Sequence, residues 1–428
     1  MLLNGPTLFV LSALVLSYLV TGLARRLNLR CLSDVIPPEF EGVFDPGQYR
    51  RSQEYMRAGA RLEQLRESFD TFLACAFVLA GGIGWADSLA RGLAGRLGLG
   101  ELGVGLTFLG GLALAQAVLS LPFDVYATFR LEARFGFNRT TPGLFIADRL
   151  KGLALGAILG GTLVSGVIWA YMRLGSAAWL AAWGVVAGFT ALMLWLGPAW
   201  LLPLFNRFTP LPPGELRSAI EAFAARHGIG LDGIFVMDGS RRSAKANAFV
   251  TGLGRKKRIS LYDTLMDRLS HEQVVAVLAH EVGHSLRRHI LKGFVTAMLK
   301  TGLLLAVLQA MLASAPLQLA FGVAQPSVHV GLAVFALAYQ PLALLLAASA
   351  NALSRRFEFE ADAFAADSPE RAKALAGALK ELSVANLANL NPHPLAVWLH
   401  YTHPPVLERV RRLEDAARAG EAGMPTHN

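Results

Sequence analysis

Long uncharged stretches of apolar residues alternate along this 428-residue chain with segments that carry most of its charge. A helix needs about 20 predominantly apolar residues to cross the hydrocarbon core of a bilayer. Seven stretches reach or approach that length, although the second is short and the sixth contains Lys300. They cover residues 6–23, 71–86, 102–122, 152–172, 174–196, 293–314 and 328–350. A large soluble core could hold one or two such helices but not seven, so the pattern predicts an integral, multi-pass membrane protein.

The overall composition supports this interpretation. Hydrophobic residues make up 54% of the chain, and its mean hydropathy of +0.43 is too high for an ordinary soluble enzyme. The first apolar stretch is expected to remain as a helix rather than to act as a cleaved signal peptide, because basic residues follow it instead of preceding it.

The distribution of charge predicts how the chain is oriented in the membrane. With seven spans, the segments 25–70, 124–151, 206–292 and the residues beyond 355 lie on one side, and they hold nearly all the Lys and Arg. The positive-inside rule places that side in the cytoplasm, at the inner membrane if the source is bacterial. Basic residues facing anionic membrane lipid account for the formal net charge of +9, so no nucleic acid is expected as a partner.

One of the charged segments contains the pattern His280-Glu281-x-x-His284. Two histidines four residues apart on a helix can bind one zinc ion, and the glutamate between them can take a proton from metal-bound water. Ser270 and Gln273 have the spacing of a capping box, which predicts that a helix starts there and carries the motif.

A zinc site of this kind needs a third protein ligand. Just beyond the seventh stretch, one helical face carries Asn351, Ser354, Arg355, Glu358 and Asp362. Such a stripe could be only the solvated face of a helix, but with the histidine motif upstream we favour Glu358 as the ligand. Asp362, one turn later, would orient a ligating histidine. Glu360 points about 160° away from Glu358 on a helix and is a poor rival.

The two motifs together resemble those of peptidase family M48, the membrane zinc metalloproteases, and are most similar to its CAAX prenyl protease 1 branch. The second motif is Asn351-x-x-Ser354-Arg355-x-x-Glu358-x-x-Ala361-Asp362. Further similar segments at 35–39, 134–138, 204–211, 243–249 and 400–405 extend the resemblance along nearly the whole chain. A shorter heat-shock-type protease of the same family shares the zinc motif but lacks the long N-terminal region.

The resemblance implies a mainly α, polytopic membrane fold. Seven transmembrane helices would enclose an intramembrane chamber, with a small α+β zinc-protease domain on its cytoplasmic side. Within that domain the local pattern predicts a helix over 213–227 and strands over 233–237, 246–250 and 258–261. The expected division is an N-terminal membrane domain (1–205), the peptidase domain (206–290), spans six and seven (291–350), the C-terminal part of the peptidase domain (351–415) and a disordered tail (416–428).

The resemblance also implies roles for single residues. One Zn²⁺ would be held by His280, His284 and Glu358, with Glu281 as the general base. Asn247 and Ala248 match an edge strand whose backbone pairs with an extended peptide. His403 and Arg409 match catalytic positions that contact the substrate or its oxyanion, although His403 could merely cap a helix and Arg409 could be a surface charge.

The substrate would be a peptide or protein, with or without a prenyl group at its C-terminus. The family name implies cleavage beside a prenylated cysteine, but the Ala-, Leu- and Arg-rich composition hints at a bacterial source, where such substrates are not expected to be common. A quality-control protease for membrane proteins is equally consistent. A transporter would need ionisable residues within its spans, and Lys300 is nearly the only one. A non-catalytic zinc-binding scaffold would not need Glu281.

Overall fold

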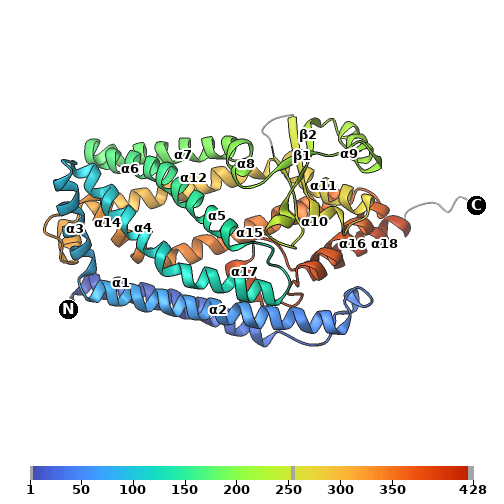
Figure 1. Cartoon of the computed structure of the whole chain (residues 1–428), viewed down its shortest axis with the longest axis horizontal. Helices are drawn as coiled ribbons and strands as arrows, with labels where there is room; N and C mark the ends of the chain where they lie inside the picture. The colour runs from blue at the N-terminus through green and yellow to red at the C-terminus, as the bar shows by residue number, and fades with distance from the viewer. Residues whose placement is uncertain (1–2, 252–255, 423–428) are drawn as a thin grey trace, which may run out of the picture.

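The apolar stretches form long helices that fill one half of the molecule in the computed structural model, which describes residues 3–251 and 256–422 (Figure 1). Five helical segments are long and apolar enough to cross a membrane: Gly5–Arg30, Glu101–Glu132, Pro142–Arg173, Gly175–Phe205 and His289–Leu312. Two further segments qualify only as bent pairs, Pro46–Leu79 with Gly82–Arg96 and Val328–Ala338 with Gln340–Ala365. The described residues therefore hold five spans, or up to seven if each bent pair is one, and every predicted stretch falls on one of these segments.

The individual helices of this half are shorter where a bend or a π-helical turn interrupts them. They are α1 (Gly5–Arg30), α2 (Pro46–Leu79), α3 (Gly82–Arg96), α4 (Glu101–Tyr126), α5 (Pro142–Leu155), α6 (Gly161–Arg173), α7 (Ala178–Leu196), α8 (Leu202–Phe205), α12 (His289–Leu312), α13 (Ala315–Leu319), α14 (Val328–Ala338) and α15 (Gln340–Ala365).

Both bends have a local cause in the sequence. Helices α2 and α3 meet at 75°, and Gly81 between them has φ of 76°, a left-handed conformation that glycine adopts without steric cost. Helices α14 and α15 meet at 64°, where Pro341 in the first turn of α15 has no N–H to continue the ladder of hydrogen bonds. The second apolar stretch, predicted as one helix over 71–86, is therefore broken at residues 80–81.

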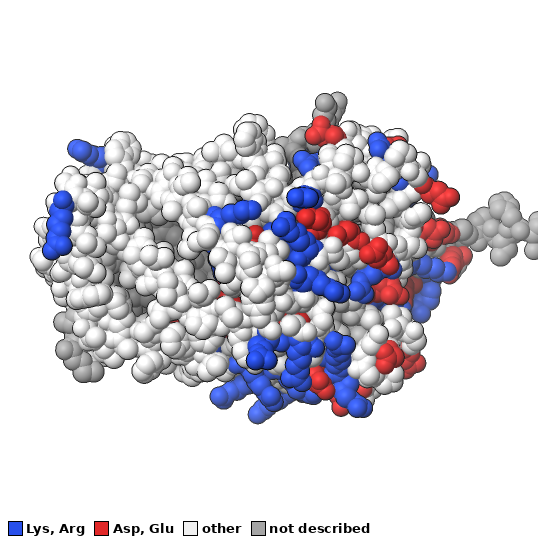
Figure 2. Space-filling model, in the orientation of Figure 1, with Lys and Arg blue, Asp and Glu red and all other residues white. Residues whose placement is uncertain are grey.

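Apolar side chains cover both the inside and the outside of this half. Val10, Leu14, Val78, Phe108 and Val330 belong to one buried cluster that joins α1, α2, α4 and α14. Large apolar side chains on the same helices and their neighbours point outwards, among them Leu16, Leu119, Trp195, Trp200 and Leu299. Figure 2 shows this half almost free of charge, with the surface hollowed between the helices on the face in view. A contiguous apolar exterior of this size is suited to lipid rather than water.

The other half contains a four-stranded sheet with the order β1-β2-β4-β3. The strands are β1 (Phe208–Pro210), β2 (Gly230–Met237), β3 (Ala248–Thr251) and β4 (Lys256–Tyr262). Strands β2 and β4 are parallel, the other two pairs are antiparallel, and β3 lies at one edge. Each of the three predicted strands is confirmed with shifted bounds. The short β1, which contains Pro210, gave no alternating pattern from which it could be predicted.

Helices pack around this sheet to complete the domain. They are α9 (Glu215–Arg226), α10 (Asp263–Met266), α11 (His271–Leu286), α16 (Pro369–Ala385), α17 (Pro394–His400) and α18 (Val406–Ala422). The predicted helix over 213–227 corresponds to α9. Helix α11 packs against α15 and α16 and also contacts β3. The predicted capping box is confirmed, since the Ser270 hydroxyl accepts from the Gln273 backbone and the Gln273 side chain accepts from the Ser270 backbone.

The predicted disordered tail from residue 416 is wrong for its first seven residues. Helix α18 continues to Ala422, and Leu413 and Ala417 are buried in its packing against α16. Ion pairs from Lys380 to Glu414 and from Lys373 to Glu421 hold the same two helices together. The small residues of this segment thus serve close packing between helices, and the rest of the predicted tail, 423–428, lies outside the described residues.

Candidate metal centre

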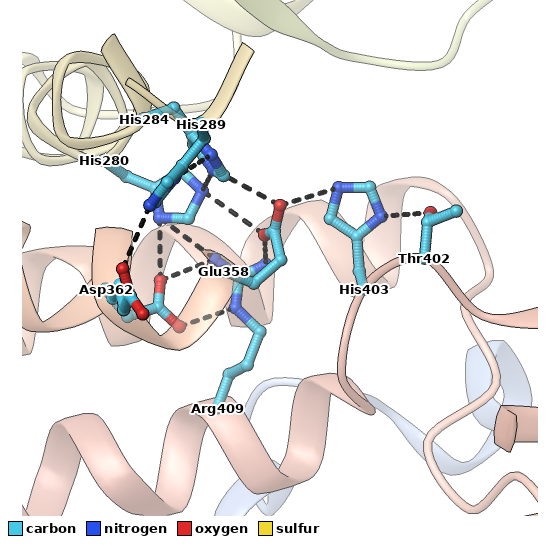
Figure 3. A network of polar contacts seen from close by, with 9 residues as sticks. His280, His284, His289, Glu358, Asp362, Thr402, His403 and Arg409 are labelled. Carbon is cyan, nitrogen blue, oxygen red and sulfur yellow. Dashed lines mark hydrogen bonds and ion pairs between the residues drawn. The ribbon is translucent and has the colours of Figure 1, made fainter. Parts of the chain in front are cut away.

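Helix α11 presents both histidines of the motif to Glu358, which lies on α15 (Figure 3). His280 Nε2 and His284 Nε2 are 3.1 Å apart. The Glu358 carboxylate completes a triangle, with Oε2 3.4 Å from His280 Nε2 and Oε1 3.3 Å from His284 Nε2. Residues that lie more than 70 positions apart in the chain thus bring two nitrogens and a carboxylate to one point, as the sequence predicted.

This triangle has the dimensions of a metal site. Ligand atoms at about 2.0–2.1 Å from a tetrahedral metal stand about 3.3–3.4 Å from one another. The observed separations of 3.1–3.4 Å match that spacing. Glu358 Oε2 is also buried without a hydrogen-bond partner, although Arg409 Nη1 and His280 Nε2 each lie 3.4 Å away, and a bound metal ion would satisfy it. The nitrogen and carboxylate donors suit a divalent cation.

Close contact between α11 and α15 makes this geometry possible. Gly283 lies within the motif, and a Cβ atom there would stand 3.1 Å from Ala361 Cα and 3.2 Å from its carbonyl oxygen. Both Gly283 and Ala361 are buried between the two helices. A larger residue at position 283 would push the helices apart and would separate the histidines from Glu358.

Asp362 and Arg409 lie behind His280. The Asp362 Oδ1 atom is 2.8 Å from His280 Nδ1, and the Arg409 guanidinium donates to both carboxylate oxygens at 2.8 and 2.6 Å. Burial opposes protonation of His280, but its hydrogen bonds with Asp362 and Glu358 outweigh this effect and raise the pKa of the imidazole to about 9. Nδ1 donates to Asp362, so once Nε2 loses its proton, as metal binding requires, its lone pair is directed at the metal position.

Arg409 is buried rather than a surface charge, with 8% of its surface exposed. Burial opposes its charge, but the hydrogen bonds to Asp362 outweigh this and raise the pKa of the guanidinium. Its Nη1 atom is 3.4 Å from Glu358 Oε2, so it also lies beside the ligand carboxylate. The predicted contact of Arg409 with a substrate stays a prediction.

Glu281 lies between the two histidines in sequence, on the same helix, and is half-buried. Burial raises the pKa of its carboxyl, and the neighbouring His280 and His284 oppose that rise. A raised pKa makes this carboxylate a better proton acceptor than an exposed glutamate, as a general base requires.

His403 lies on the opposite side of Glu358 from His280 and His284 (Figure 3). Its Nε2 atom is 3.3 Å from Glu358 Oε1, and its Nδ1 atom is 2.9 Å from the Thr402 hydroxyl. With 63% of its side chain exposed, the ring is accessible to a ligand. The structure therefore brings His403 to the predicted metal ligands.

Asn247 and Ala248 lie where β3 begins. Ala248 pairs with Leu261 of β4, and the Asn247 carbonyl accepts a hydrogen bond from the Tyr262 backbone. Since β3 is an edge strand that contacts α11, the structure places this segment beside the helix that bears the motif.

The sequence did not predict a role for His289. Its Nδ1 atom is 3.0 Å from Nδ1 of His284, and its Nε2 atom is 3.2 Å from Glu360 Oε2. His289 follows His284 by five residues, a spacing that does not place two side chains side by side on one helix. The contact forms because α11 ends at Leu286 and the chain turns before α12 begins at His289. Glu360, rejected as a metal ligand, is indeed outside the ligand triangle but contacts this histidine.

Fold and site together define a membrane-embedded metalloendopeptidase. The profile described as CAAX prenyl protease N-terminal, five membrane helices, matches residues 25–207, and that of peptidase family M48 matches residues 210–417. The chain belongs to peptidase family M48. It is an integral, multi-pass membrane protein that acts on a peptide or protein substrate, and its family implies a metal at the site.

Relatives from other organisms resemble the chain over most of its length. The CAAX prenyl protease 1 homolog of Oryza sativa subsp. japonica is 35% identical over 95% of this chain and 97% of its own. CAAX prenyl protease 1 of Saccharomyces cerevisiae is 29% identical over 89% of this chain and 88% of its own. The crystal structure of S. mikatae Ste24p superposes with a TM-score of 0.89 at 28% identity, covering 96% of this chain and 100% of that one.

Proposed function

We propose that this protein is a zinc endopeptidase that hydrolyses a peptide bound along the edge of β3, at a site that faces the cytoplasm. The observation that carries the proposal is the triangle of His280, His284 and Glu358, formed in a chain of family M48. Two histidines and a glutamate are the ligand set of catalytic zinc in other metallopeptidases.

The chemistry divides between the metal and the side chains around it. Bound at these ligands, zinc supplies Lewis-acid polarisation of the scissile carbonyl and lowers the pKa of a bound water towards about 7. Glu281 takes the proton of the attacking water and returns it to the leaving amine, a role that its raised pKa supports. His403 donates a hydrogen bond to the developing oxyanion, since its ring is exposed and lies 3.3 Å from Glu358.

Arg409 acts through Asp362 in this proposal rather than by contact with the substrate. Its guanidinium is buried and is engaged by both oxygens of Asp362. Asp362 in turn holds the His280 ring in the tautomer whose Nε2 atom binds metal. Arg409 is therefore a positioning residue.

The edge of β3 is the proposed binding site for an extended substrate peptide. An edge strand offers unpaired backbone donors and acceptors to an extended peptide, which can add as a further strand. Asn247 and Ala248 begin this edge, and β3 contacts α11. A peptide on this edge would bring a scissile bond towards the metal ligands without depending on particular side chains.

The positive-inside rule supports a cytoplasmic site. Figure 2 shows Lys and Arg gathered over the half that carries the sheet, with a few at the opposite end of the long helices. Cytoplasmic segments carry such an excess of positive charge, which also favours anionic lipid at the membrane surface.

We infer that the substrate carries a prenyl group near its C-terminus. The relatives from Oryza sativa and Saccharomyces cerevisiae are both described as CAAX prenyl proteases and match this chain over most of their length. The hollow between the apolar helices in Figure 2 could also accommodate the hydrocarbon chain of a lipid.

The deciding experiment compares a farnesylated CaaX peptide with its unprenylated twin as substrates of the detergent-purified protein, with Glu281→Gln as the blank. Cleavage of the farnesylated peptide alone supports the proposal. Equal cleavage of both peptides identifies instead a broader membrane endopeptidase that could clear misfolded membrane proteins. Cleavage of neither by a zinc-loaded protein overturns the proposed activity.

A further inference from the structure

We propose that His289 and Glu360 form a hydrogen-bonded relay that holds the metal ligand His284 in its metal-binding tautomer. The relay rests on the proposed metal site, and it assigns a role to two residues outside the ligand triangle. The Nδ1 atom of His280 contacts the Asp362 carboxylate directly, whereas the Nδ1 atom of His284 contacts the imidazole of His289, which in turn contacts the Glu360 carboxylate.

The directions of the hydrogen bonds follow from the contacts. His284 points Nε2 into the ligand triangle, so its Nδ1 atom must carry the proton. That proton is donated to Nδ1 of His289, 3.0 Å away. The only proton of a neutral His289 is then on Nε2, which donates it to Glu360 Oε2 at 3.2 Å. Each donor in this chain of contacts therefore meets an acceptor.

Packing fixes the middle member of the relay. His289 is 5% exposed, and its ring lies stacked on Phe357 with centroids 4.2 Å apart and planes 8° from parallel. Arg288, the residue before it, has φ of 55°, and this left-handed residue turns the chain from the end of α11 into α12. The stacking and the turn together restrict the His289 imidazole to few orientations beside His284.

Basic residues hold the outer member of the relay. Glu360 Oε1 accepts a hydrogen bond from Arg356 Nε at 3.2 Å, and Lys292 Nζ lies 3.9 Å from its Oε2 atom. Glu360 is thus kept as an anion facing His289. A carboxylate behind a metal-bound histidine fixes the ring and raises its basicity as a ligand, and here that influence passes through His289.

A purely structural role would predict something different. As a packing residue at the start of α12, His289 could be replaced by phenylalanine, a somewhat larger residue that keeps an aromatic ring stacked on Phe357. His289→Phe removes both ring nitrogens and would leave metal affinity unchanged in that case. Glu360→Gln keeps the shape and removes only the charge, at a side chain that is 27% exposed and therefore tolerant of substitution.

The test measures zinc affinity by competition with a chromophoric chelator, using the full-length detergent-purified protein, together with the absorption spectrum of Co²⁺ in the site. His289→Phe is expected to weaken zinc binding by about 10- to 100-fold, and Glu360→Gln in the same direction by about tenfold or less. Since both act through one chain of hydrogen bonds, the double variant should lose no more than His289→Phe alone. The Co²⁺ spectrum should change in each.

Glu221→Gln is the matched control, because Glu221 forms the same kind of helical ion pair, with Arg217 on α9. Wild-type affinity in folded Glu360→Gln and His289→Phe proteins would overturn the relay, as would losses that add in the double variant. If His289→Phe does not fold, Glu360→Gln alone decides. A wild-type protein that binds zinc tightly but cleaves no peptide overturns the proposed function and leaves the relay standing, whereas one that binds no zinc overturns both.

Discussion

The Arg409 guanidinium donates two hydrogen bonds to the Asp362 carboxylate, from Nε to Oδ2 at 2.8 Å and from Nη2 to Oδ1 at 2.6 Å. Both side chains are less than 10% exposed. The guanidinium has the planar fork that matches a carboxylate in this geometry, which a lysine ammonium does not have. Because Asp362 also contacts His280, the pair links α18 to α11, which carries the two histidine ligands.

The first prediction follows from this pair. Arg409→Lys keeps the positive charge but loses the bidentate contact, so Asp362 should hold His280 less firmly. We expect about tenfold weaker zinc binding or more, with a matching loss of cleavage. Arg409→Ala should be worse, because it removes the guanidinium from a buried carboxylate at a cost of roughly 3–5 kcal/mol in stability. Metal titration and thermal unfolding of the purified variants measure both effects.

Arg411→Lys is the control for this prediction. Arg411 lies two residues further along α18, is 55% exposed and pairs with Glu39 instead. The positioning role fails if Arg409→Lys binds zinc as wild type does, or if the two lysine variants lose equal affinity.

The second prediction separates proton transfer from metal binding. Glu281→Gln preserves the shape of the side chain, and Glu281 is not one of the three residues that form the ligand triangle. The variant should keep its zinc content and lose cleavage by about 10²–10⁴-fold, since the amide cannot accept the proton of the attacking water. Zinc analysis and peptide turnover on the same preparation check this. Substantial turnover by a zinc-replete variant would remove Glu281 from the mechanism.

The third prediction concerns removal of the metal. A ligand that binds only the folded state stabilises it by about 2.7 kcal/mol at 100 times its dissociation constant. Chelation should therefore lower the unfolding temperature and abolish cleavage, and added zinc should restore both. Glu358→Ala loses one of the three ligands and should show neither response. If the unfolding temperature and the activity of the wild-type protein do not change when the chelator is added, the assignment of this site is contradicted.

The sequence predicted much of this site because its signals are local. His280 and His284 share one helical face, and Glu358 and Asp362 follow the same spacing on another helix. The contact of His289 with His284 could not be predicted in this way, because it depends on the left-handed residue Arg288 that turns the chain between two helices. Helical spacing alone points Glu360 away from the ligands.

The fold was predictable to a similar degree. Apolar length identified the membrane helices, but the breaks at Gly81 and Pro341 depend on conformations that hydropathy does not report. The tail beyond residue 415 was predicted to be disordered because small residues are also common in linkers. Burial of Ala417 between α18 and α16 shows that here they allow close helix packing.

The last prediction concerns the dependence of stability on pH through Glu39 and Arg411. Arg411 Nε donates to Glu39 Oε1 at 2.5 Å and joins the turn Pro38–Phe40 to α18, the helix that carries Arg409. This hydrogen bond lowers the pKa of the Glu39 carboxyl, against the opposing effect of burial. A folded pKa below the unfolded value of about 4.3 means that ionised Glu39 stabilises the protein above that pH. The contribution is lost as the pH falls through the lowered pKa.

Glu39→Gln should therefore lower the unfolding temperature at pH 7, and the difference from wild type should shrink as the pH falls below about 4. The effect should be small, because Arg411 is 55% exposed and solvent screens its charge. Thermal unfolding of the detergent-purified proteins across this pH range measures it, with Glu41→Gln, an exposed neighbour, as the control. A difference that stays constant from pH 7 to the acid limit would mean that the ion pair does not stabilise the attachment of α18. Loss of cleavage in Glu39→Gln at pH 7 with zinc affinity unchanged would contradict the idea that this contact acts only on stability.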